Sequence, residues 1–69
     1  MLRGSDIQRD GMFLELFDSK ENQLFEAFYS DSTDEMQFTS FTTEDVPFEI
    51  IEEFLRQARI LLTPIENKE

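Results

Sequence analysis

The spacing of apolar residues changes once along this chain, near Thr42, and this change constrains the fold more than any other feature. Before Thr42 there are short segments rich in strand-favouring side chains, separated by turn residues. After it, apolar residues recur every three or four positions, as in an amphipathic helix. Consecutive strands followed by a helix predict an α+β domain.

The predicted strands span about residues 12–18, 24–29 and 36–42. A turn at Asp10-Gly11 precedes the first of them. The polar run 19–22 favours a hairpin loop of about three to five residues, with Asn22 able to adopt a left-handed conformation. The stretch 30–34, rich in Ser, Thr and Asp, favours the next turn. Short connections join antiparallel neighbours, so we expect a three-stranded antiparallel β-meander.

A C-terminal amphipathic helix is predicted from Pro47 onwards and should pack on one sheet face. Thr43 or Asp45 is expected to cap its first turn, and Glu52 and Arg56 are spaced to form an ion pair. The apolar stripe of this helix contains Phe48, Ile51, Phe54, Leu55, Ala58, Leu61 and Leu62.

The single predicted domain spans residues 11–65. Residues 1–10 lack a clean period and predict an N-terminal arm or a short edge strand, and residues 66–69 predict a C-terminal tail. A core of this size supplies only about 3–5 kcal/mol, so uncrosslinked chains of this length often oligomerise. With no cysteine in the sequence, disulfides cannot supply the missing stability.

The first two predicted strands carry large apolar side chains on both faces, although one helix covers one face of a sheet. A four-residue hairpin loop pairs Phe17 with Leu24, whereas a three-residue loop pairs it with Phe25. In either register one face holds apolar side chains that the helix does not reach, and we expect a homodimer to bury them. The residues expected to self-associate are Phe13, Phe17, Leu24, Phe28 and Phe41.

Two alternatives remain for the occupant of that face. A different protein can cover it, or the N-terminal arm can fold over it with Leu2 and Ile7. The four-residue register also sets Glu15 opposite Glu26, and association should then tighten at mildly acidic pH because desolvation and repulsion favour the protonated form. If both glutamates lie at a wet rim, this pH dependence is not expected.

The charge of the chain is strongly asymmetric, with a formal net charge of −10. Residues 18–53 contain eleven acidic side chains and one basic one, Lys20. Such a field repels nucleic acids and anionic membranes and attracts basic proteins. We expect no nucleic-acid or membrane partner. The residues expected to face a basic partner are Asp31, Asp34, Glu35, Glu44, Asp45, Glu49 and Glu52.

Catalytic and metal chemistry find little support in the composition. The chain has no His and no Cys, so the usual proton shuttles, thiol nucleophiles and zinc ligands are missing. The loop 31–35 offers oxygen atoms to a calcium ion, but it lacks the glycine and the distant glutamate of an EF-hand. We therefore expect no enzymatic activity, no cofactor and no metal site.

The sequence predicts a small acidic interaction module that is homodimeric through its uncovered sheet face. The alternative is an inhibitor or immunity-type protein that blocks a basic partner through its acidic surface. Apolar runs are too short for a transmembrane helix or a signal-peptide core, so we expect a cytoplasmic protein.

Overall fold

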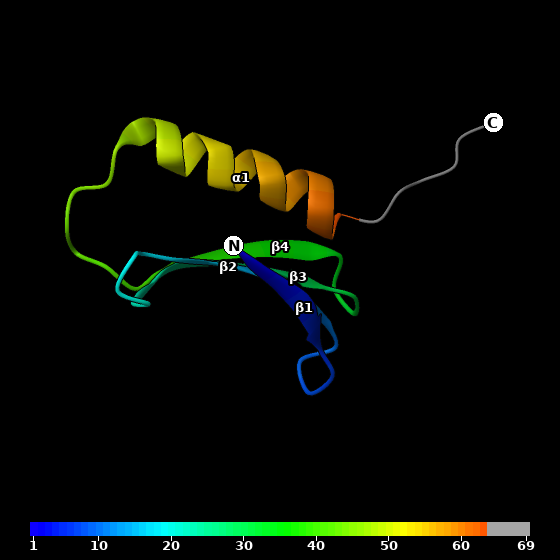
Figure 1. Cartoon of the computed structure of the whole chain (residues 1–69). Coiled ribbons are helices and arrows are strands. Elements are labelled where there is room, and N and C mark those ends of the chain that lie inside the picture. The colour runs from blue at the N-terminus through cyan, green and yellow to red at the C-terminus, as the bar shows by residue number, and fades with distance from the viewer. Residues whose placement is uncertain (64–69) are drawn as a thin grey trace.

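The computed structural model describes residues 1–63 and shows an open, four-stranded antiparallel sheet with one helix on one of its faces (Figure 1). The sheet order follows the chain order, β1-β2-β3-β4. In chain order the elements are β1 (Leu2–Asp6), β2 (Gly11–Phe17), β3 (Gln23–Ser30), β4 (Glu35–Ser40) and α1 (Phe48–Leu62). The predicted α+β class, with its antiparallel sheet and C-terminal helix, is confirmed.

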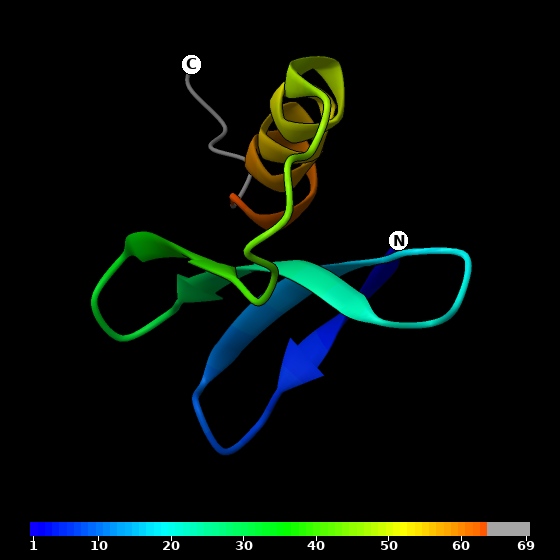
Figure 2. The same ribbon diagram turned by 90° about the vertical axis from the view of Figure 1, so that its left-hand side faces the viewer.

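The predicted number of strands was wrong, because residues within the segment 1–10 form a fourth strand, β1. In β1, Arg3 pairs with Leu14 and Ser5 pairs with Met12, and these two polar side chains share the sheet face that carries α1. An edge strand that bends away from the helix needs no apolar alternation, so the sequence pattern left an arm and a short edge strand as alternatives there, and the structure has the edge strand (Figure 2). The predicted tail 66–69 lies outside the described residues.

The core lies between α1 and the two central strands, β2 and β3. Alternate residues of these strands point toward the helix, since Leu14 pairs with Ala27 and Leu16 pairs with Phe25. The Phe54 ring enters this face from α1, with its centroid 5.6 Å from that of Phe25. The buried core residues are Leu14, Phe25, Ala27, Tyr29, Phe54, Ala58 and Leu62.

The β2–β3 hairpin adopts the register of a four-residue loop for most of its length. Glu15 and Glu26 are direct cross-strand partners, and a register shift after Leu16 pairs Phe17 with Gln23 instead of Leu24. That shift leaves Leu24 as the extra residue of a bulge in β3, and the Asp18 N–H donates to the Asn22 carbonyl at 2.9 Å, so the loop is one residue shorter than in the simple hairpin.

Side-chain hydrogen bonds hold the loop that follows β2. The Asp18 carboxylate accepts the backbone N–H groups of Lys20 and Asn22 at 2.8 and 2.9 Å. These bonds lower the pKa of Asp18 below its ordinary value of 3.8, with the backbone bond from Asn22 as the largest cause. The left-handed residue is Glu21, with φ of 67°, and not Asn22 as expected. The side-chain amide of Asn22 instead donates a hydrogen bond to the Asp18 carboxylate at 3.2 Å.

The turns after β1 and β3 lie at the other end of the sheet and support each other. The Asp31 N–H donates to the Asp10 carbonyl at 2.9 Å. Asp34 is left-handed, with φ of 61°, and its carboxylate accepts the Tyr29 hydroxyl. Aspartate tolerates this backbone conformation better than most residues, which explains why these turns need no glycine there.

The start of α1 differs from its prediction. The N-cap residue is Pro47, and no side chain caps the helix, so neither Thr43 nor Asp45 has the expected role. Arg56 pairs with Glu53 at 2.7 Å rather than with Glu52, and this hydrogen bonding lowers the pKa of Glu53. Spacings of three and four residues both bring side chains together on a helix, so sequence spacing does not decide between the two glutamates.

We predict that Gly11→Ala strongly destabilises the fold, whereas Gly4→Ala has a smaller effect. A Cβ atom at Gly11 would clash with the main-chain oxygen of Tyr29 and lie 2.5 Å from the Phe28 ring. At Gly4 the nearest atom is the end of the Phe13 ring, at 2.8 Å, which can move aside. Urea unfolding should show a loss of at least about 1–3 kcal/mol for Gly11→Ala, the usual cost of overpacking. Equal losses for the two variants would contradict this packing.

Candidate interaction surface

The sheet face away from α1 carries the aromatic side chains that were expected to self-associate. Phe13 and Phe28 are cross-strand partners on this face. Phe28 is buried, with 6% of its surface exposed, and Phe13 is half-buried. Leu24, which was expected on this face, packs instead against the core cluster under α1, because the register shift in β3 falls at this residue. Phe17 is 38% exposed, at the end of β2. The expected continuous apolar patch is therefore largely sheltered within the single chain.

Arg9, in the turn between β1 and β2, covers the centre of this far face. Its guanidinium carbon lies 4.1 Å from the centroid of the Phe28 ring, which is a cation–π contact. Arg9 also pairs with Glu26 at 2.8 Å and with Asp6 at 2.6 Å. Ile7, which was considered as a cover, is instead fully exposed in the same turn. The segment 1–10 thus shelters the far face by charge and ring contacts rather than by aliphatic side chains.

The same arginine changes the electrostatics of the facing glutamates. Glu15 and Glu26 lie opposite each other, as one of the two registers predicted. Arg9 places a positive charge against Glu26, so part of their repulsion is offset inside the chain. The Arg9 hydrogen bonds also lower the pKa of Asp6 below 3.8, with the side-chain bond as the largest cause.

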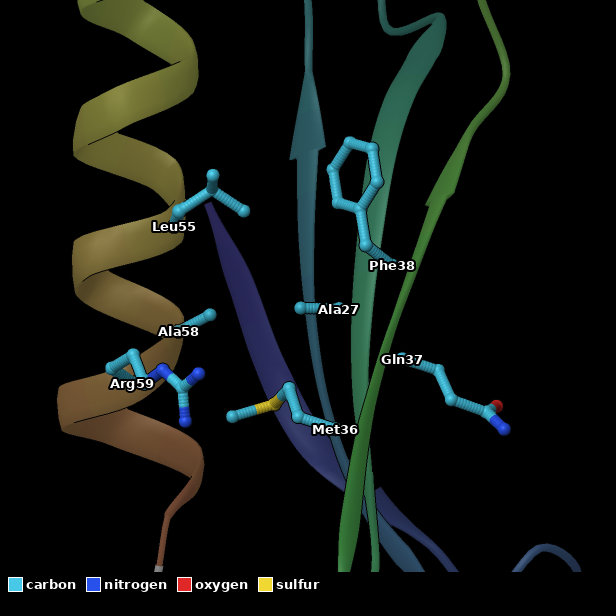
Figure 3. Close-up of a pocket in the computed structure, with 7 residues that line it drawn as sticks. All are labelled: Ala27, Met36, Gln37, Phe38, Leu55, Ala58 and Arg59. Carbon is cyan, nitrogen blue, oxygen red and sulfur yellow. The ribbon is translucent and has the colours of Figure 1, made fainter.

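A different apolar surface is open, in a groove between α1 and β4. The groove has a volume of about 210 Å³. Figure 3 shows Leu55, Ala58 and Arg59 of α1 facing Met36 and Phe38 of β4. Two large apolar side chains of its walls remain accessible, with Leu55 44% and Phe38 47% exposed.

The groove exists because α1 lies over β2 and β3 and not over β4. Phe38 still contacts the core, with its ring centroid 5.4 Å from that of Phe25 and 6.2 Å from that of Phe54. Its outer side has no cover within the described residues. The helix stripe predicted to be buried is also incomplete, because Phe48 and Leu55 on its β4 side are exposed.

The outer edge of β4 is unpaired among the described residues, since β4 is the last strand of the sheet. Its sequence, EMQFTS, has no lysine or proline, and its pairing with β3 has no register shift. Lysine, proline and β-bulges are the features that usually keep an edge strand from pairing with another chain, and β4 has none of them. An open groove and an unprotected edge therefore lie side by side.

The acidic residues predicted to face a basic partner are divided between two ends of the molecule (Figure 1). Asp31, Asp34 and Glu35 lie at the β3–β4 turn, whereas Glu44 and Asp45 lie beyond the opposite end of β4. Glu49 and Glu52 lie in the N-terminal half of α1.

At the second end, Asp18 and Glu44 line a polar hollow of about 380 Å³. Phe41, also expected at a self-association surface, lines this hollow and is exposed. Within residues 1–63, no three acidic side chains gather closely enough to hold a metal ion. No helix in the described part of the chain is long and apolar enough to cross a membrane.

Comparison with known proteins gives no relative from which to transfer a role: no family model, no curated protein and no solved structure matches the chain.

The groove was not predicted from the sequence, although the sequence of β4 indicates an apolar face. In the third predicted strand the apolar residues Met36 and Phe38 alternate with the polar residues Gln37 and Thr39. This alternation predicts one apolar face, but it does not say whether the helix reaches that face. Leu55 lies at the margin of the helix stripe, where spacing alone leaves burial undecided.

We predict that Arg9→Met lowers the free energy of unfolding by about 1 kcal/mol near neutral pH, because it removes the cation–π contact with Phe28 and the ion pairs with Asp6 and Glu26. The pKa of Asp6 is lowered in the folded state. The ion pair of Asp6 with Arg9 therefore stabilises the folded state fully above the ordinary Asp pKa of 3.8. This stabilisation is lost as the pH falls through the lower pKa of Asp6 in the folded state. The difference from the wild type should shrink in acid.

Urea unfolding at neutral pH and well below pH 3.8 measures both effects. Arg3→Met, at an exposed arginine of β1, is the matched control and should change stability little. A loss as large for Arg3→Met as for Arg9→Met would contradict the role given to Arg9.

Proposed function

We propose that this chain is a non-enzymatic protein–protein interaction module that binds through the side formed by α1 and β4. The observation that carries the proposal is the exposure of Phe38 and Leu55 in a groove beside an unpaired strand edge. A partner strand can satisfy the edge while its side chains fill the groove. This is how strand addition combines affinity with specificity.

The size of the chain supports an interaction role over a catalytic one. A small domain with one sheet and one helix has few walls from which to build a deep cleft. The absence of His and Cys from the sequence removes the commonest catalytic side chains. Exposed aromatic and aliphatic side chains at one locus are typical of protein-binding surfaces.

The far face of the sheet is a weaker candidate than the α1–β4 side. Phe28 lies under Arg9, so a partner at that face would have to displace the contacts of Arg9 with Phe28, Glu26 and Asp6. Binding at the α1–β4 side requires no such displacement, and association is favoured where the free surface already has its bound shape.

A photo-crosslinking amino acid at position 38 should give a discrete protein adduct when the chain is expressed in its native cell. Position 60 is the matched control, because Ile60 is 57% exposed and does not line the groove. Mass spectrometry identifies the adduct. Equal crosslinking from both positions, or none from position 38, would contradict a binding surface between α1 and β4.

A second candidate function is supported by the acidic end. Asp18 and Glu44 come from separate segments and line one polar hollow, and Asp45 follows directly in the sequence. A concentrated negative field of this kind accelerates encounter with basic proteins and helps to select them. In this role the chain would be an inhibitor of a basic partner.

Polylysine serves as a probe for this second function. Its binding should weaken steeply with added salt, and Glu44→Gln with Asp45→Asn should weaken it more than Asp31→Asn with Glu35→Gln. Both pairs of substitutions remove the same formal charge, so the second pair controls for net charge. Equal weakening by the two pairs would leave only a nonspecific charge effect and would exclude a defined acidic site.

A further inference from the structure

We infer that the partner at the α1–β4 side is a second copy of this chain, joined by antiparallel pairing of β4 with β4 across a two-fold axis at Phe38. This inference rests on the proposed function and specifies its partner. Three properties of the surface are self-complementary about one axis: the backbone of the edge, the apolar groove and the charges along the flank of the helix.

The backbone of β4 fixes the register of such a pairing. The Phe41 N–H donates to the Leu24 carbonyl at 2.8 Å, so residue 41 directs its backbone groups toward β3. Directions alternate along an antiparallel strand, and the N–H and C=O groups of Met36, Phe38 and Ser40 therefore point to the free edge. A register with Phe38 opposite Phe38 also pairs Met36 with Ser40, which satisfies all three residues in both copies.

This pairing keeps the two helices on the same side of an extended sheet. Antiparallel partners point their side chains to the same face, so Phe38 of each copy lies beside the other on the helix side. Each helix covers β2 and β3 of its own chain, and the two grooves join into a single trough above the paired edges. The exposed parts of Phe38 and Leu55 from both copies fill this trough.

The flank of α1 that borders the trough carries charges that match the same axis. Residues three and four apart lie on one side of a helix, so Glu52 continues the stripe of Leu55 and Arg59. A two-fold axis at the level of Leu55 sets Glu52 of one helix opposite Arg59 of the other. Leu55 and Phe38 line the same groove, so the axis required by the helix and the axis required by the strand coincide.

Like-charge repulsion between two acidic chains is small at this interface. The strand β4 carries a single charge, Glu35, at its end. In the register centred on Phe38, antiparallel pairing sets Glu35 opposite Phe41 and keeps the two glutamates at opposite ends of the interface. The other edge of the sheet is less suited, because β1 presents Arg3 and Ser5 on the helix side and bends away from α1 (Figure 2).

Analytical ultracentrifugation of the purified chain tests the inference. The sedimenting mass should rise with concentration from 8.2 kDa to about twice that value in the micromolar range. A chain that stays monomeric at several hundred micromolar would overturn the inference. If the position-38 adduct then contains a different protein, the proposed function stands and only the identity of the partner is wrong.

Charge reversal at the flank of the helix tests the axis. Glu52→Arg and Arg59→Glu should each raise the dimer dissociation constant about three- to tenfold, and the double variant should restore it. These substitutions change net charge in opposite directions. An effect of net charge alone would therefore strengthen the Glu52→Arg dimer and weaken the Arg59→Glu dimer, and that result would overturn the pairing of Glu52 with Arg59.

Blocking the strand edge provides a test that does not alter the groove. Ser40→Pro removes an N–H that points away from β3, and proline is tolerated at such edge positions. It should abolish dimer formation. Well below the dimer dissociation constant, where both variants are monomeric, its unfolding midpoint should stay near that of Ser40→Ala, which removes the same hydroxyl bond to Thr42. A dimer that forms equally well in both variants would overturn pairing through β4.

Discussion

One helix cannot cover a four-stranded sheet, and most features of this structure follow from that mismatch. An α-helix is about 10 Å wide with its side chains, whereas neighbouring strands are about 4.8 Å apart. Here α1 lies over β2 and β3, where Phe54 enters the core beside Phe25. The two outer strands receive no such cover. One of them bends away with polar side chains, and the other keeps Phe38 in its partly open face.

The face opposite the helix is closed by a different device. Residues 1–63 have no second helix or sheet that covers this face. The β1–β2 turn instead brings Arg9 over Phe28 and pairs it with Glu26, which combines shelter of a ring with partial neutralisation of facing carboxylates. Gly11 allows this close packing because a side chain there would collide with β3. The first ten residues are therefore part of the fold rather than an appendage to it.

These two solutions leave an unpaired strand edge and accessible apolar side chains together on one side of the described structure. On the sheet face away from α1, Arg9 covers Phe28 and pairs with Glu26. The α1–β4 side instead combines an unpaired strand edge with accessible apolar side chains. Charge is arranged in keeping with this division. Acidic side chains concentrate at the two ends of β4 and along α1, and the middle of β4 is uncharged. A neutral centre between charged ends permits close approach of another chain at the middle of β4 and resists it at the ends.

The sequence alone determined the class of fold, the central hairpin as one of two registers and the position of α1, because these depend on the period of apolar residues and on local turn chemistry. It left β1 undecided between an arm and a short edge strand, and it did not reveal the role of Arg9 or the open groove. Each of these depends on which segments meet in space. Arg9 contacts a ring nineteen positions away, and Phe38 is exposed because α1 lies over β2 and β3 and not over β4. Apolar spacing reports which side chains favour burial. Only the tertiary structure decides which of them find a neighbour.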